Sequence, residues 1–143
     1  MQYREMTIED YDDLIALWQQ SEGLRIREAD SRRGIQHYLA RNPGLSFIAL
    51  HQDIMIGTIM AGHDGKRGYI QHLTVSGDYR RQGVGTKLLD LCLDSLLKTG
   101  IVKSHIFVLK TNDSGALFWK KRGWTKRNDI DLFSYINKGQ DNA

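Results

Sequence analysis

Basic residues and glycines stand close together in the middle of the chain, where they could bind a phosphate group. Arg80 and Arg81 are followed by Gly83 and Gly85, and a leucine-rich run that reaches Leu97 begins directly afterwards. The first N–H groups of a helix have no partner within it, and the helix dipole adds partial positive charge there. Glycine has no Cβ, so an anion can approach the backbone closely. The spacing therefore predicts a pyrophosphate site at a helix N-terminus.

Two familiar phosphate-binding loops do not fit these residues. A Walker loop needs Gly-Lys-Ser/Thr at its end, whereas Gly85 is followed by Thr86 and then Lys87. A dinucleotide fingerprint needs a third glycine where this chain has Leu88. The pattern that remains is Arg-x-x-Gly-x-Gly. Taken alone, it is equally typical of an ordinary glycine turn before a helix.

Acidic residues and a histidine elsewhere in the chain could move a proton. His72 lies in the apolar stretch before the loop, and Glu28 and Asp30 lie in a charged segment near the N-terminus. Imidazole and carboxylate groups are the usual general bases. The structural alternatives are solvated loop charges for Glu28 and Asp30, a helix cap for Asp30, and a hydrogen-bonded sheet histidine for His72.

The elements that must position these residues follow from local patterns. Residues 69–75 are β-branched, aromatic or aliphatic at most positions and predict a strand. The apolar residues from Val84 to Leu96 recur at spacings of three and four, which predicts a helix ended by Gly100. Strand, loop and helix together form the centre of the predicted fold.

The remaining elements follow from apolar periodicity, caps and turn residues. We expect a strand over 3–6, a helix from Thr7 that Gly23 ends, and a helix from Asp30 or Ser31 to residue 42. We also expect strands over 47–50 and 54–61, a strand over 105–109, a helix over 116–120 that Gly123 closes, and a last strand over 132–136.

Composition limits the classes of protein to consider. The 143 residues suit one domain over 1–143, and the net charge of +3 is too small to argue for a nucleic-acid partner. The basic run Lys120-Lys121-Arg122 leaves nucleic-acid binding open as an alternative, although such charges usually complement a helix dipole.

No apolar run is long enough to span a membrane, and the first residues lack the apolar segment of a signal peptide. We therefore expect a cytoplasmic protein without a membrane partner. Cys92 is the only cysteine, and its leucine neighbours indicate a core residue.

A second motif joins the first in the C-terminal part of the chain. Asn112 precedes the segment Ala116-Leu-Phe-Trp-Lys-Lys-Arg-Gly123-Trp124. With the Arg80-x-x-Gly83-x-Gly85 pattern and the order of elements, the chain resembles the GCN5-related N-acetyltransferases over nearly its whole length. The resemblance implies an α/β (α+β) fold. Its central sheet is mixed but mainly antiparallel, splayed between the fourth and fifth strands, and flanked by about four helices.

The same resemblance implies an activity. It predicts an acetyl-CoA-dependent N-acetyltransferase in which a primary amine attacks the thioester directly in a ternary complex. A non-catalytic module that binds or senses acyl-CoA is the alternative. No metal is implied, the acceptor amine is not identified by the sequence, and a homodimer is compatible with the family.

Roles for individual residues are carried over from the family by position. The main chain of Leu73, Thr74 and Val75 would hold the pantetheine arm, and Asn112 would hydrogen-bond that arm unless it only caps a helix. The general base is expected to be Glu28 or His72, since the loop that carries Glu28 borders the acceptor site in this fold. As an alternative, the acidic residues of this loop bind a cationic acceptor without moving protons. The residues expected around the pyrophosphate are Arg80, Arg81, Gln82, Gly83, Val84, Gly85 and Thr86.

One position departs from the family pattern. Many members have a tyrosine as the second aromatic of the pair, where its hydroxyl can protonate the departing thiolate, but this chain has Trp119. The indole N–H donates a hydrogen bond but is not a proton source at neutral pH. We therefore expect Trp119 to pack against the cofactor, with water or the ammonium proton of the acceptor protonating the thiolate.

Overall fold

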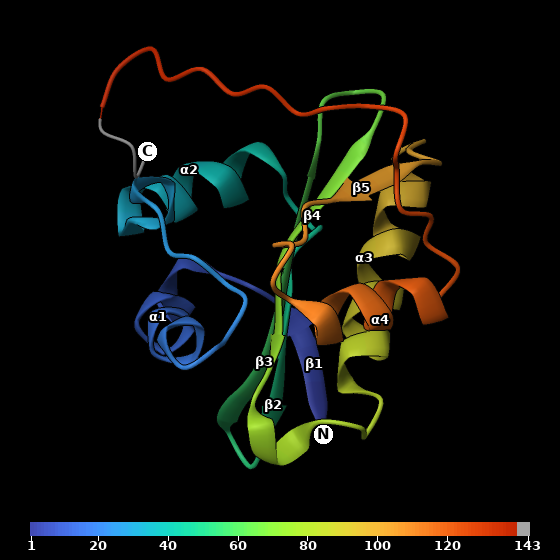
Figure 1. The fold of residues 1–143 in the computed structure, drawn as a ribbon. Coiled ribbons are helices and arrows are strands. Elements are labelled where there is room, and N and C mark those ends of the chain that lie inside the picture. Colours follow the sequence, from blue (N-terminus) through green and yellow to red (C-terminus); the bar gives the residue numbers. More distant parts are fainter. Residues whose placement is uncertain (140–143) are drawn as a thin grey trace.

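A five-stranded sheet forms the centre of the computed structural model, which describes residues 1–139 (Figure 1). The last four residues of the expected domain lie outside the described part. The strands lie side by side in chain order, with antiparallel pairing from β1 to β4 and parallel pairing of β4 with β5. The expected mixed, mainly antiparallel sheet is confirmed. The strands are β1 (Gln2–Glu5), β2 (Phe47–His51), β3 (Ile54–His63), β4 (Gly68–Val75) and β5 (Ser104–Ile106).

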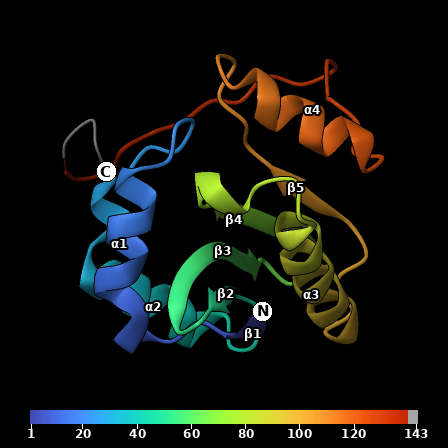
Figure 2. The same cartoon turned by 90° about the horizontal axis from the view of Figure 1, so that it is seen from below.

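Helices cover both faces of this sheet (Figure 2). One face carries α1 (Tyr11–Gln19) and α2 (Arg32–Arg41), and the other carries α3 (Val84–Lys98) and α4 (Asp113–Lys121). Short 3₁₀ turns over Ile8–Asp10, Glu28–Asp30 and Gly77–Tyr79 precede α1, α2 and α3. The described residues contain no helix that is both long and apolar enough to cross a bilayer.

The alternation of side chains along the strands divides the core into two layers. Ile48 and Met60 pack with Trp18 and the rest of the apolar cluster beneath α1 and α2. The neighbouring Ala49 and Ile59 point to the opposite face and join the cluster beneath α3. Strands that are buried on both faces must be continuously apolar, which explains why β3 lacks a polar stripe.

Cys92 lies in the core beneath α3, as its leucine neighbours predicted. The thiol donates a hydrogen bond to the Leu45 carbonyl oxygen, with 3.0 Å between Sγ and O. Burial raises the pKa of the Cys92 thiol well above its ordinary value. A thiol held in this state is a poor nucleophile.

Helix boundaries mostly follow the predicted caps. Ser31 is the N-cap of α2, and its hydroxyl oxygen accepts the Gly34 N–H at 3.1 Å. Gly100 and Gly123 take left-handed conformations just beyond α3 and α4, as predicted. The prediction for α1 was too long, because the helix ends at Gln19 and Gly23 lies in the following loop.

Two features of β4 prepare the site. His72 and Leu73 stand opposite the single residue Ile59, which makes a β-bulge, and His72 has a φ of 49°. On the other edge, β5 pairs with β4 only up to Ile70 and then diverges. The expected splay between the fourth and fifth strands is confirmed, and β5 is shorter than the predicted 105–109.

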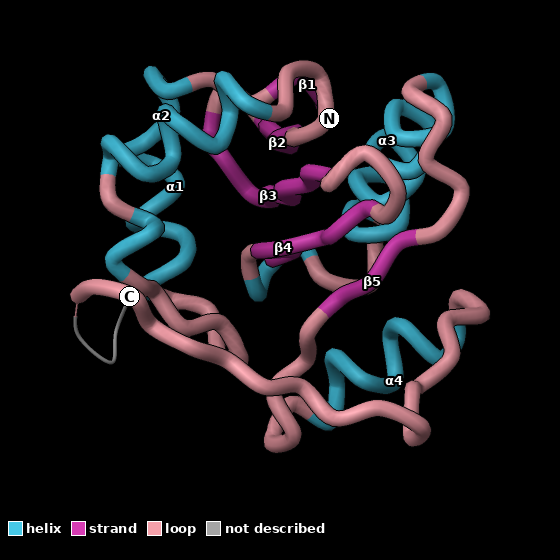
Figure 3. Tube along the Cα trace, turned by 90° about the horizontal axis from the view of Figure 1, so that it is seen from above, coloured by secondary structure: helices cyan, strands magenta, loops and turns pink. Residues whose placement is uncertain are grey.

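The predicted strand over 132–136 was wrong. These residues form no strand, and Phe133 and Tyr135 are 90% and 86% exposed. The chain beyond α4 instead crosses to the side of the molecule that carries α1 and α2 (Figure 3). Apolar alternation produces a strand only where a neighbouring edge pairs with it, and residues 132–136 have no such neighbour.

Candidate active site

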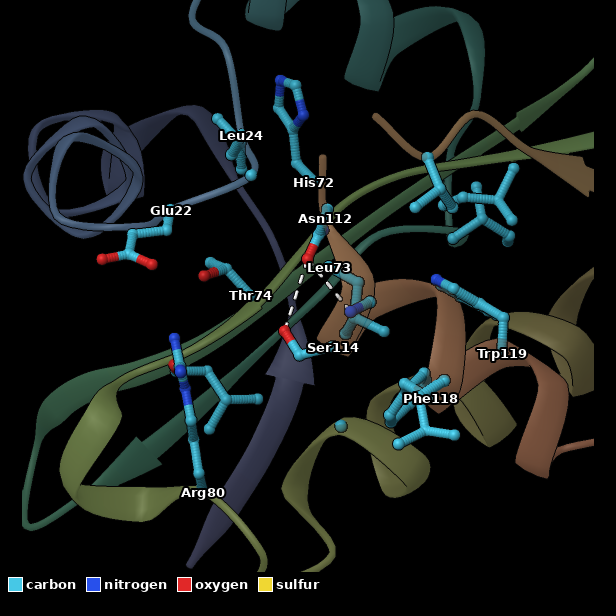
Figure 4. Close-up of a pocket in the computed structure, with 18 of the residues that line it drawn as sticks. Glu22, Leu24, His72, Leu73, Thr74, Arg80, Asn112, Ser114, Phe118 and Trp119 are labelled. Atoms are coloured by element: carbon cyan, nitrogen blue, oxygen red, sulfur yellow. Dashed lines mark hydrogen bonds between the residues drawn. The ribbon is translucent and has the colours of Figure 1, made fainter. Parts of the chain in front are cut away.

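A cavity of about 790 Å³ opens where β4 and β5 separate. Its walls come from the main chain of β4, the loop after α1, the N-terminus of α3 and the inner side of α4 (Figure 4). This volume is within the range of sites for drug-sized ligands and cofactors.

The loop before α3 forms one end of the cavity. Gly83 is the N-cap of α3 with a φ of 81°, and Arg81 also has a positive φ, of 63°. Six of the seven residues predicted around the pyrophosphate line the cavity. Gln82 does not, because its amide nitrogen is turned toward the Asp78 carbonyl oxygen at 3.4 Å. The residues that line this end are Arg80, Arg81, Gly83, Val84, Gly85 and Thr86.

Glycine is favoured at the two positions of the loop for different structural reasons. A Cβ added to Gly83 would meet no atom within 4 Å, so its left-handed φ is what favours glycine there. A Cβ added to Gly85 would lie 3.2 Å from the Phe118 ring. Gly85 therefore lets α4 pack closely against the first turn of α3.

Arg122 joins the two helices at this end of the cavity, and sequence reasoning missed it. Its Nε donates to the Thr86 hydroxyl oxygen at 2.9 Å, and one of its Nη groups donates to the Phe118 carbonyl oxygen at 2.9 Å. The guanidinium also stacks over the Phe118 ring, 3.6 Å from the centroid. In the sequence, Arg122 could be seen only as part of a basic run. Lys121 of the same run also lines the cavity.

The edge of β4 forms the middle of the cavity. Leu73, Thr74 and Val75, the residues expected to hold the pantetheine arm, all line it. Because β5 has diverged, the N–H and C=O groups on this edge have no partner strand and face the cavity. The Thr74 hydroxyl also shares a hydrogen bond with Ser21, which ties the loop after α1 to this strand.

Asn112 lies where α4 approaches the loop after α1. Its side-chain oxygen accepts the Gly115 N–H at 3.0 Å, so it caps α4, and the residue also lines the cavity. A Cβ added to Gly23 or Gly115 would lie 2.6 or 2.4 Å from the Asn112 amide nitrogen. The helix cap predicted as the alternative for Asn112 is therefore present, and the capping residue also lines the cavity.

His72 stands at the end of the cavity away from Arg80 (Figure 4). Its Nε2 lies 2.7 Å from Oδ1 of Asp30, and the two side chains are only 14% and 8% exposed. The other carboxylate oxygen of Asp30 accepts the Arg27 N–H at 2.8 Å. Glu28 is exposed and does not line the cavity. The structure thus brings His72 to the site together with Asp30 and leaves Glu28 outside.

Buried contacts hold the bulge that presents His72. The Trp18 indole donates to the Thr58 hydroxyl oxygen at 3.0 Å, and that hydroxyl donates to the His72 carbonyl oxygen at 2.9 Å. The Trp18 and His72 rings meet edge to face, with centroids 4.6 Å apart. Contacts from Trp18 on α1 and Thr58 on β3 therefore stabilise the left-handed backbone conformation of His72.

Trp119 lines the cavity from α4 and is only 7% exposed. Its ring packs edge to face against Trp124 and Phe118, with centroids 4.7 and 5.1 Å away. This aromatic cluster makes the α4 wall apolar between Arg122 and Asn112.

Basic side chains clearly outnumber acidic side chains around the cavity. Among the described residues that line it, Glu22 is the only acidic one. The basic ones are Arg25, Arg27, Arg80, Arg81, Lys121 and Arg122. A cavity with this balance attracts polyanionic ligands.

Comparisons with known proteins agree with this geometry. The sequence matches the acetyltransferase (GNAT) family over residues 8–124. It is 30% identical over 114 residues to an acetyltransferase of Pectobacterium atrosepticum, covering 80% of both chains. It is 28% identical over 132 residues to one of Sodalis glossinidius, covering 92% of both.

A solved structure shares the fold. The PaiA N-acetyltransferase of Thermoplasma acidophilum, determined in complex with coenzyme A, superposes with a TM-score of 0.78 at 24% identity, covering 91% of this chain and 92% of that one. The motifs, the splayed sheet and these matches lead to one conclusion: the chain belongs to the GNAT family of acetyltransferases.

Proposed function

We propose that this protein transfers the acetyl group of acetyl-CoA to a primary amine, by direct attack of the amine in a ternary complex. One observation carries the proposal. A single cavity has a helix N-terminus flanked by arginines at one end, a histidine paired with a carboxylate at the other, and a strand edge without a partner strand between them.

The residues expected to hold acetyl-CoA follow this arrangement. The diphosphate would lie on the N–H groups at the start of α3, between Arg80, Arg81 and Arg122. The pantetheine arm would run along Leu73–Val75 like an added strand, with Asn112 beside it. An unpaired N–H group on this edge could also stabilise negative charge on the acetyl oxygen during attack.

His72 is the residue that we propose as the general base. Because its Nε2 faces the Asp30 carboxylate, that nitrogen carries a hydrogen, and Nδ1 is then the nitrogen free to accept a proton. The amine forms a bond to the acetyl carbon while the carbon–sulfur bond breaks and CoA leaves as the thiolate. The proton that the amine loses passes to His72 and can return to the thiolate, so charge and atoms balance.

Two other routes have less support. Glu28 lies outside the cavity, so it is poorly placed to act as the base. An acetyl-cysteine intermediate would need Cys92, which is buried beneath α3 and does not line the cavity. A module that binds acyl-CoA without chemistry would not need the buried His72–Asp30 pair. A cytoplasmic location and a homodimer stay predictions.

The test combines binding with turnover. Acetyl-CoA should raise the melting temperature of the purified protein, and an amine panel should include acceptors that release free CoA thiol. His72→Gln should keep the thermal shift and lose most of the thiol release. No thermal shift with acetyl-CoA, or thiol release that is the same without any added amine, would contradict the proposal.

A further inference from the structure

The end of the cavity near His72 carries positive charge that the cofactor site does not use. Arg25 and Arg27 line the cavity on the loop between α1 and α2. Three other arginines already lie around the start of α3, where the diphosphate is proposed to bind. Figure 4 shows His72 and Leu24 of this loop together, far from Arg80. Both arginines belong to this loop, which lies at the end of the cavity where we propose that the acceptor enters.

Arg27 is fixed next to the proposed base. Its N–H donates to one oxygen of the Asp30 carboxylate, and the other oxygen of the same carboxylate pairs with His72. The half-buried Arg27 side chain lines the cavity from this position. One carboxylate thus holds both the imidazole of the proposed base and the main chain of Arg27.

No carboxylate neutralises these guanidinium groups in the described chain. The ion pairs among residues 1–139 involve Arg4, His72 and Arg127, and neither Arg25 nor Arg27 takes part in one. Both oxygens of Asp30 are already occupied, and its side chain is 8% exposed. Glu22 lines the cavity, but Figure 4 shows its carboxylate pointing away from His72.

The positive charge at this end of the cavity favours some classes of acceptor amine over others. An amine that carries several positive charges would meet the two arginines of this loop, and like charges at close range are unfavourable. A carboxylate, by contrast, matches the planar, two-pronged donor geometry of an arginine. Placing it on Arg27 would bring an amino group on the same molecule toward His72.

We infer that the acceptor is a small amine that also carries a carboxylate, as an amino acid does, and that Arg27 binds this carboxylate. The inference rests on the proposed acetyl transfer and adds the class of acceptor. Arg27 acts here in acceptor binding and takes no proton.

Matched acceptor pairs test this directly. Each of a set of L-amino acids is compared with its own carboxamide, which keeps the amine and side chain but removes the negative charge. Spermidine serves as the polycationic acceptor. We expect at least one amino acid to be acetylated with a kcat/KM about tenfold or more above that of its carboxamide, since hydrogen bonds between charged groups are among the strongest in proteins. Spermidine should be the poorest substrate.

Arg27→Gln provides the second arm, because the backbone N–H that binds Asp30 is retained. This change should raise the KM for the amino acid about tenfold, while the KM for acetyl-CoA and the turnover of the carboxamide stay the same. Arg33→Gln removes the same charge from an exposed position on α2 outside the cavity and should change nothing.

The possible outcomes distinguish a failure of the inferred acceptor class from a failure of the proposed acetyl transfer. Faster acetylation of spermidine or of the carboxamides, or an Arg27→Gln effect confined to the KM for acetyl-CoA, would overturn the acceptor class while leaving acetyl transfer intact. Absence of thiol release with every amine, in protein that is stabilised by acetyl-CoA, would contradict both. Calorimetric titration of amino acid and carboxamide into the CoA-saturated protein must show the same preference as the kinetics.

Discussion

His72 Nε2 lies 2.7 Å from Asp30 Oδ1, although the two residues are 42 positions apart in the sequence. Asp30 ends the 3₁₀ turn before α2, and His72 sits in the bulge of β4. The contact is almost shielded from solvent, and both elements are pinned by further hydrogen bonds. The imidazole therefore has a fixed ring orientation before any substrate arrives.

The first prediction concerns this pair. His72→Gln should lower kcat about a hundredfold, within the range that general bases contribute. Asp30→Asn should lower kcat less, because the imidazole is still present but is held less firmly. The KM for acetyl-CoA should stay the same in both. A larger loss from Glu28→Gln than from His72→Gln would show that the base was assigned to the wrong residue.

The second prediction concerns the loop before α3. Gly83→Val should raise the KM for acetyl-CoA at least about tenfold, because a branched side chain disfavours the left-handed backbone and stands beside the N–H groups proposed to bind phosphate. Gly65→Val is the matched control, since Gly65 also has a positive φ and open surroundings but lies in the turn between β3 and β4. It should cost stability without a change in KM. Equal KM values for both variants and the wild type would refute the loop assignment.

The third prediction concerns Arg122. Arg122→Gln should raise the KM for acetyl-CoA several-fold and leave kcat unchanged, because the guanidinium holds α4 against Thr86 and adds positive charge to the end of the cavity proposed to bind phosphate. Arg127→Gln removes a charge from the exposed pair with Asp129 and should have no effect on either constant. Steady-state kinetics at two salt concentrations measure both. An effect of the same size from Arg127→Gln would mean that only overall charge matters.

The fourth prediction concerns Trp119. Trp119→Phe should retain kcat within about threefold of the wild type, since an indole N–H supplies no proton at neutral pH. The melting temperature should fall, because the contact between Trp119 and Trp124 is reduced. A loss of kcat of about a hundredfold in a folded protein, as for removal of a general acid, would instead give the indole N–H a direct role in the reaction.

The fifth prediction concerns stability at low pH. Burial works against the charge of Asp10, but hydrogen bonds from Arg4 and from the Thr7 N–H outweigh it and hold the pKa of Asp10 below its ordinary value. This contribution is complete at neutral pH and is lost as the pH falls through the lowered pKa. Asp10→Asn should therefore lower the free energy of unfolding by about 2 kcal/mol at pH 7. Urea titrations should show the two proteins converging below about pH 4, and a difference independent of pH would contradict this account.

The sequence could predict those parts of the site whose geometry is local. Gly83 and the helix that follows it lie within one stretch of chain, so the glycine, the apolar spacing and the N-terminus of α3 could be inferred together. Asn112 was predictable both as a cap and as a site residue, because both readings depend on the residues directly after it.

Other parts depended on contacts between distant segments. Nothing near His72 in the sequence points to Asp30, and Arg122 could not be separated from its basic neighbours until α4 was placed against α3. The prediction of a strand over 132–136 was wrong because it also depended on a contact with a distant segment. The alternation of side chains does not show whether the edge of another strand is available for pairing.

The structure of the protein crystallised with acetyl-CoA tests the central claim most directly. The account predicts the diphosphate on the N–H groups of residues 83–86, the pantetheine arm along Leu73–Val75, and the acetyl group at the end of the cavity that holds His72. A cofactor bound elsewhere, or an acetyl group at the far end of the cavity from His72, would contradict it.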